Sequence, residues 1–249
     1  MADDCSIQTE TCWMVRSCLQ LWKQVFLSIA CIACFTHTEE SANGAERYFG
    51  LVFSSQAKPK LPRFTHVWAT MVKVSNAELP PDQWVYQIDT ISWVPASLHV
   101  RTFKLRPEPG ANLSLKDTLA FVQSHHEHVS VWGPFELPAF IYQQFMCQKA
   151  RLESGQVLYQ CIDSFRSPKN VSDCIHSLTD MDRQNGRDAY PLSRFGDDAA
   201  DEFVKVLKDR GRVIGSGPSV EFAYQALGLQ CYPITRRTCT TTKQFGLGH

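Results

Sequence analysis

Short runs of β-branched and aromatic residues dominate the middle of the chain and predict strands. The stretch "FTHVWATMVKV" is mostly apolar with His66 inside it, and "WVYQIDTISWVP" places a few polar residues in an apolar run. "RPEPGANLS" (106–114) is rich in proline, glycine and polar residues, so we expect a loop there. The predicted strands are 64–74, 84–95, 98–105, a short one from His128, and 156–163.

Apolar residues recur at helical spacing in several later segments. Ser114 is a suitable N-cap for a helix to about His126, because Leu115, Leu119 and Val122 then lie on one face. The order of elements predicts an α+β fold, a small antiparallel sheet packed against helices with a helical C-terminal third. The further predicted helices are 137–153, one from Asp197 or Asp198 to Gly211, and 218–228.

The N-terminal segment differs from the rest of the chain. An apolar run at 25–35 follows cations at Arg16 and Lys23 and precedes a polar stretch, which is the layout of a signal peptide. We expect an exported protein that is periplasmic, otherwise extracytoplasmic, or anchored to the membrane. In a lipoprotein variant of this prediction, Cys31 or Cys34 carries the lipid. The open alternative is a cytosolic protein with an N-terminal helix and reduced thiols. The expected organisation is a signal peptide or anchor at 1–36, a linker at 37–62, a single α+β catalytic-like domain at 63–237, and a frayed tail at 238–249.

Composition and charge bear on several classes of partner. The 249 residues carry 25 basic and 25 acidic side chains, so bulk charge does not favour nucleic acid as a partner. Ten cysteines are many for a cytosolic protein, and their spacing fits no zinc finger. The cluster "HHEH" (125–128) ends a helix and begins a strand, so its side chains diverge, and we expect no metal and no cofactor.

Cys174 is the residue on which the predicted chemistry depends. It follows Ser172 and Asp173, either of which can cap a helix, so Cys174 is expected in the first turn. Backbone N–H groups at a helix start stabilise a thiolate and lower its pKa, which makes Cys174 a candidate nucleophile. A buried structural thiol, half of a disulfide and a metal ligand are the alternatives.

A thiol nucleophile needs a base, and His66 is the best candidate because a strand holds its imidazole rigidly. Taken alone, His66 also fits a core histidine satisfied by a hydrogen bond. A third group should orient the imidazole. The next predicted strand offers Asp89 and Ser92, and His99 comes after it; Asp89 is chemically the most ordinary choice.

Three segments carry a family resemblance: "FTHVWATMV" (64–72), "VWGP" (131–134) and "DCIHS" (173–177). Together they resemble the circularly permuted branch of the papain-like superfamily, which includes NlpC-type cysteine hydrolases and lecithin:retinol acyltransferase-like enzymes. The resemblance spans about 64–207. It implies a permuted papain-like fold with Cys174 as nucleophile, His66 as base, and Asp89, Ser92 or His99 as orienting group.

The expected function is therefore that of an exported thiol-dependent hydrolase or acyltransferase. Cys174 would attack an amide or ester and form a thioester, with a cell-wall peptide or a lipid or lipoprotein acyl group as substrate. The alternative is a non-catalytic, disulfide-stapled exported binding domain in which Cys174 pairs with Cys161, Cys147 or Cys231. Asn112 and Asn170 also begin glycosylation sequons.

Overall fold

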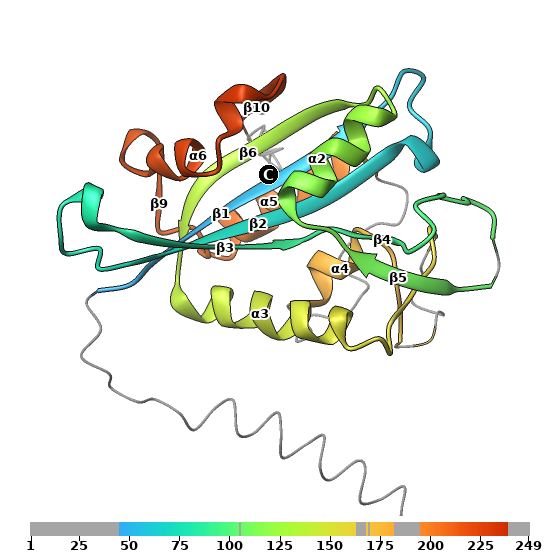
Figure 1. Cartoon of the computed structure of the whole chain (residues 1–249), viewed down its shortest axis with the longest axis horizontal. Helices are drawn as coiled ribbons and strands as arrows, with labels where there is room; N and C mark the ends of the chain where they lie inside the picture. Colours follow the sequence, from blue (N-terminus) through green and yellow to red (C-terminus); the bar gives the residue numbers. More distant parts are fainter. Residues whose placement is uncertain (1–44, 105, 163–167, 169, 182–194, 239–249) are drawn as a thin grey trace, which may run out of the picture. The chain divides into compact units, whose positions relative to one another are not determined.

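A computed structural model describes residues 45–104, 106–162, 168, 170–181 and 195–238 (Figure 1). The larger sheet has the order β10-β6-β1-β2-β3, with β9 paired to β6. Strands β10 and β6 run parallel, and the other neighbouring strands of this sheet run antiparallel. Its strands are β1 (Arg47–Gln56), β2 (Thr65–Ser75), β3 (Val85–Ile91), β6 (His128–Leu137), β9 (Gly215–Ser216) and β10 (Ile234–Arg237).

A smaller sheet has the order β4-β5-β7-β8, in which β7 and β8 run parallel. Both sheets are thus mixed, whereas the sequence predicted an antiparallel one. The segment 106–114, predicted to be a loop, contains strand β5. Its Gly110 lets the ring of Trp93 pack directly on the strand backbone, because a Cβ at this position would lie 2.0 Å from the ring. The strands are β4 (Trp93–Pro95), β5 (Glu108–Asn112), β7 (Leu158–Tyr159) and β8 (Val171–Ser172).

The described part of 98–105 forms turns instead of the predicted strand, with Leu98 at φ +57° and Phe103 88% exposed. The helices are spread along the chain, so the helical C-terminal third was wrong; β9 and β10 also lie in that third. The helices are α2 (Leu115–Ser124), α3 (Ala139–Glu153), α4 (His176–Thr179), α5 (Asp197–Asp209) and α6 (Phe222–Ala226). Single 3-10 turns are η1 (Pro62–Phe64), η2 (Pro81–Gln83), η5 (Pro218–Val220) and η6 (Leu229–Cys231).

Helices cover both faces of the larger sheet, so the protein has two apolar cores. On β2, Val67 and Ala69 pack with α3, α4 and α5, on what we call the α3 face. Trp68 and Val72 point the other way, toward α2 and α6, on the α2 face. In Figure 1, α2 crosses in front of the central strands while α5 lies behind them.

Strand β1 lies between β2 and β6, inside the segment predicted to be a linker (37–62). Its apolar residues point to both faces: Phe49 and Leu51 to the α2 face, Val52 to the α3 face. A strand buried on both sides reads as a short continuous apolar run rather than as an alternation. The folded unit therefore includes β1 and starts before residue 63.

The predicted signal peptide or anchor (1–36) lies outside the described residues, as does the tail after Thr238. Among the helices that the structure describes, none has the length and apolar character needed to cross a membrane.

One carboxylate joins the start of α5 to three strands. Asp197 accepts hydrogen bonds from the buried hydroxyls of Ser54 on β1 and Ser130 on β6, and it pairs with Arg237 of β10 at 3.0 Å. The next residue, Asp198, instead makes an exposed ion pair with Lys60. Asp197 therefore fixes α5 across the middle of the sheet.

We expect Asp197→Ala to lower the free energy of unfolding by about 2–3 kcal/mol, because two buried hydroxyls lose their acceptor. Asp198→Ala removes the same charge from the same helical turn, but only an exposed ion pair is lost, so its cost should stay below about 1 kcal/mol. Urea unfolding of both variants measures the difference, and equal losses would contradict the role given to Asp197.

Candidate functional site

His66 lies near the start of β2 with its side chain on the α2 face. Its ring stacks on Trp68 at 5.4 Å between centroids, and a 2.8 Å hydrogen bond joins its Nε2 to the hydroxyl of Ser92. Both His66 and Ser92 are buried. Burial disfavours the charged imidazolium and lowers the pKa of His66 to about 3. His66 is therefore neutral at pH 7.

Cys174 lies two residues before α4, which begins only at His176. The oxygen Oδ1 of Asp173 accepts hydrogen bonds from the backbone N–H groups of Ile175 (2.8 Å) and His176 (2.6 Å). The donors expected to stabilise a thiolate are thus taken by a carboxylate.

The sulfur of Cys174 is enclosed by protein, although the residue as a whole is only half-buried. Burial, followed by the negative charge of Asp173, raises the pKa of Cys174 despite a hydrogen bond from the backbone N–H of Val67. The expected lowering of this pKa was wrong, because a carboxylate caps a helix of one turn in place of the thiolate.

Of the predicted catalytic residues, His66 and Ser92 are joined by a hydrogen bond. Asp89 points to the α3 face, where the hydroxyl of Tyr142 donates to it at 3.1 Å. His99 lies in an exposed turn, hydrogen-bonded to the backbone of Ser97. Within the described part of the chain, no hydrogen bond or ion pair joins His66 to Cys174 or to Asp89.

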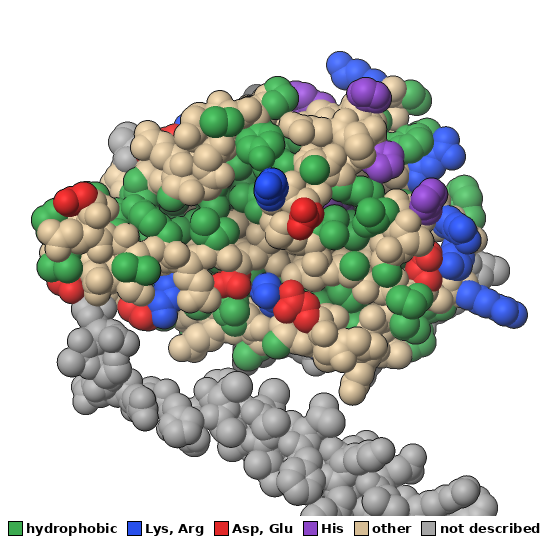
Figure 2. Space-filling view, viewed as in Figure 1, with side chains coloured by type: hydrophobic (Ala, Val, Ile, Leu, Met, Phe, Trp, Pro, Cys, Tyr) green, Lys and Arg blue, Asp and Glu red, His purple; other side chains and the backbone are tan. Residues whose placement is uncertain are grey.

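The histidine cluster at 125–128 spans the end of α2 and the start of β6, as the sequence predicted. His125 bonds back to the carbonyl of Phe121 at 2.9 Å, and His126 has a φ of +55°. Histidine side chains gather toward one end of the face shown in Figure 2. Among the described residues, no group of three or more His, Cys, Asp or Glu side chains is placed to hold a metal ion.

A second site, which the sequence did not predict, lies along the free edge of β3. Among the strands that the structure describes, β2 is the one that pairs with β3. The carboxamide of Asn112, at the end of β5, accepts from the backbone N–H of Ser92 (2.7 Å) and donates to the carbonyl of Thr90 (2.9 Å). Because backbone groups of an antiparallel edge strand point outward at every second residue, Ile88 and Tyr86 continue the same outward row.

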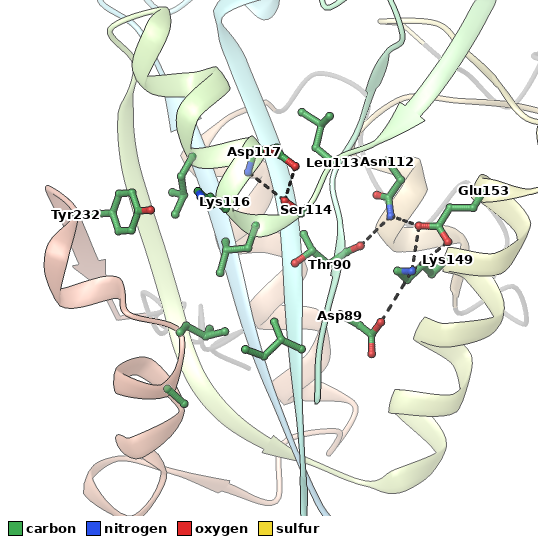
Figure 3. Close-up of a pocket in the computed structure, with 15 residues that line it drawn as sticks. Asp89, Thr90, Asn112, Leu113, Ser114, Lys116, Asp117, Lys149, Glu153 and Tyr232 are labelled. Carbon is green, nitrogen blue, oxygen red and sulfur yellow. Dashed lines mark hydrogen bonds and ion pairs between the residues drawn. The ribbon is translucent and has the colours of Figure 1, made fainter. Parts of the chain in front are cut away.

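A hollow of about 730 Å³ lies beside this edge (Figure 3). On the α2 face it is lined by Leu115, Leu119 and Leu227, together with one cation and one carboxylate of α2, Lys116 and Asp117. Ile88 also lines the hollow and is 45% exposed, and Tyr86 beside it on the strand is exposed as well. Figure 2 shows apolar side chains gathered over the middle of this face.

Charged residues line the other side of the same hollow. Lys149 of α3 contacts Glu153 at 3.0 Å and Asp89 at 3.9 Å, and the amide of Asn112 donates to Glu153 at 2.8 Å. Figure 3 shows these side chains facing one another across the gap between α3 and β3. Two carboxylates against one ammonium leave this side of the hollow net negative.

No family model, no curated protein and no solved structure matches this chain.

We expect the buried His66 to make the free energy of unfolding decrease as the pH is lowered. An exposed histidine has a pKa near 6.5, whereas burial lowers the pKa of His66 to about 3. Between these two pH values, the imidazole of His66 is protonated in the unfolded chain but not in the folded one. The contribution of neutral His66 to the free energy of unfolding is complete above pH 6.5 and decreases as the pH falls toward 3. Between pH 7 and pH 5 it amounts to about 2 kcal/mol of unfolding free energy.

Urea unfolding at several pH values measures this effect. His66→Gln should flatten the dependence between pH 7 and pH 5, whereas His99→Gln, at an exposed position, should leave it unchanged. Identical pH curves for wild type and His66→Gln would show that His66 is not buried in neutral form.

Proposed function

We propose that this protein is an exported binding domain that takes an extended polypeptide segment of a partner along the free edge of β3. The observation that carries the proposal is the carboxamide of Asn112 at that edge. It makes with Ser92 and Thr90 the two hydrogen bonds that the N–H and C=O of one residue of an added parallel strand would make. Export is part of the proposal on the strength of the N-terminal sequence alone.

The edge beyond Asn112 has the properties of a strand acceptor. The outward backbone groups of Ile88 and Tyr86 have no backbone partner on that side within the described residues. Soluble proteins usually protect such an edge with charges, proline or a covering element, because it templates pairing with another chain. Here charged residues lie on one face of the edge only, and on the other face the side chains of Ile88 and Tyr86 are exposed beside a hollow.

The two sides of the hollow specify the chemistry of the partner. Side chains of an added strand alternate between the faces of the sheet. One set would enter the apolar side, beside Leu115 and Leu119, and the other would approach Asp89 and Glu153. The net negative charge there favours lysine or arginine, so the preferred segment alternates apolar and basic residues.

A labelled octapeptide of alternating valine and lysine tests this proposal by fluorescence anisotropy. We expect saturable binding that Ile88→Pro weakens at least about tenfold, because proline removes an outward N–H and leaves the bonds to β2 intact. A valine–glutamate octapeptide should bind more weakly. Phe103→Pro, at another exposed apolar position, is the matched control and should bind like wild type.

Thermal unfolding of both proline variants checks that they fold. Equal affinity of folded Ile88→Pro and wild type for the valine–lysine peptide would refute strand addition at β3.

A second candidate is the thiol-dependent hydrolase or acyltransferase of a permuted papain-like protein. It is favoured by the hydrogen bond of His66 to Ser92 and by the position of the Cys174 sulfur at the backbone N–H of Val67, the residue after His66. Ser92, rather than Asp89 or His99, would then orient the imidazole. His66 would have to turn from Trp68 toward the thiol and accept its proton as a neutral base.

Mass spectrometry after incubation with a p-nitrophenyl ester tests this candidate. It requires an acyl group on Cys174 that is lost in His66→Ala and unaffected in Cys231→Ala, a change at an exposed cysteine. We expect no thioester at Cys174 in the native protein, because the thiol is protonated and lacks a base. An acyl-Cys174 that depends on His66 would make the enzyme the better interpretation.

A further inference from the structure

The two short parallel strands β7 and β8 bring two cysteines to matching positions. Leu158 pairs with Val171 and Tyr159 with Ser172, and the backbone N–H of Gln160 continues the ladder to the carbonyl of Ser172 at 3.3 Å. Cys161 lies in a bend and Cys174 in a turn just beyond these strands, and the same register continued by two residues would set them opposite each other. Neighbouring strands lie about 4.8 Å apart, and disulfides join Cα atoms about 4.4–6.8 Å apart.

The surroundings of the two sulfurs support the same placement. The hydroxyls of Tyr159 and Thr102 donate hydrogen bonds to the sulfur of Cys161. Negative charge on either Cys161 or Cys174 raises the pKa of Tyr159, and negative charge on Cys161 also raises that of Cys174. Both cysteines therefore lie close enough to Tyr159 for their charges to act on its hydroxyl.

We propose that Cys161 and Cys174 form an intramolecular disulfide by exchange with a small-molecule disulfide. The thiolate of Cys161 attacks the disulfide, forms a mixed disulfide and releases one thiolate of the reagent. Cys174, after losing its proton, attacks the sulfur of Cys161, and the second thiolate of the reagent leaves. Two cysteine thiols and one reagent disulfide thus become one protein disulfide and two reagent thiols.

Burial and the charge of Asp173 raise the pKa of both cysteines, but two hydroxyls donate to the sulfur of Cys161 and oppose this rise, so we expect Cys161 to react first. The bond would close the loop 161–174 and link the end of β7 to the turn that precedes α4. It would also remove the thiol that the second candidate function requires. The disulfide is independent of strand addition at β3, so either proposal can fail alone.

Peptide mapping of the full chain tests the disulfide after equilibration with oxidised glutathione and trapping of free thiols by alkylation. We expect one cross-linked peptide pair that joins Cys161 to Cys174 and disappears on reduction. Oxidation should raise the melting temperature by roughly 5–10 °C. Cys161→Ser and Cys174→Ser should each abolish this rise, whereas Cys147→Ser and Cys231→Ser, at exposed cysteines, should retain it.

Recovery of Cys161 and Cys174 as alkylated thiols, or of Cys174 bound to any other cysteine, would overturn the proposal. The map of the wild-type chain decides this question even where a serine variant does not fold.

Discussion

Burial of β1 on both faces is the constraint on which the rest of the structure depends. The strand pairs with β2 along its whole length and with β6 on the other side, so its side chains meet helices above and below the sheet. Apolar residues fill both cores, but Ser54 and Ser55 are also fully buried and need hydrogen-bond acceptors. Asp197 at the start of α5 accepts from Ser54 on the α3 face, and Glu127 after α2 accepts from Ser55 on the α2 face. Two adjacent hydroxyls of one strand thereby help to position both helical layers.

The same alternation decides which candidate residues can meet. Ser55 pairs with His66 across β1 and β2, so the imidazole shares the α2 face, whereas Asp89 on β3 faces α3. The sulfur of Cys174 is instead near the backbone N–H of Val67, which lies in the plane of the sheet. A pleated strand presents neighbouring residues to opposite faces. Ser92 meets His66 because both lie on the α2 side of their strands, and this makes His66 a satisfied core histidine in the structure.

The helices were predictable from sequence because their signals are local. Ser114 caps α2 through the N–H of Asp117, as its position before Leu115 and Leu119 indicates, and α3 and α5 follow the predicted apolar spacing. β1 was missed because a strand covered on both faces lacks alternation, and the polar segments around it suggested a linker. β5 was missed because glycine and proline predict a turn locally, whereas Gly110 is there to admit the ring of Trp93. Asn112 begins a glycosylation sequon, and only tertiary structure places its amide at the edge of β3.

Asn112 and Asp173 show why the two candidate sites differ in what they can bind. Each side chain satisfies backbone groups at the end of an element, where no regular partner exists. At α4, Asp173 takes the N–H groups of Ile175 and His176, and its charge opposes a thiolate at Cys174, so the helix start offers little to a developing anion. At β3, the carboxamide of Asn112 pairs with the outward N–H of Ser92 and the outward carbonyl of Thr90 and reaches no further along the strand. The groups at Ile88 and Tyr86 lie beyond its reach, next to a hollow with apolar and acidic sides. The capacity to bind a partner through backbone hydrogen bonds therefore lies at the strand edge rather than at the cysteine.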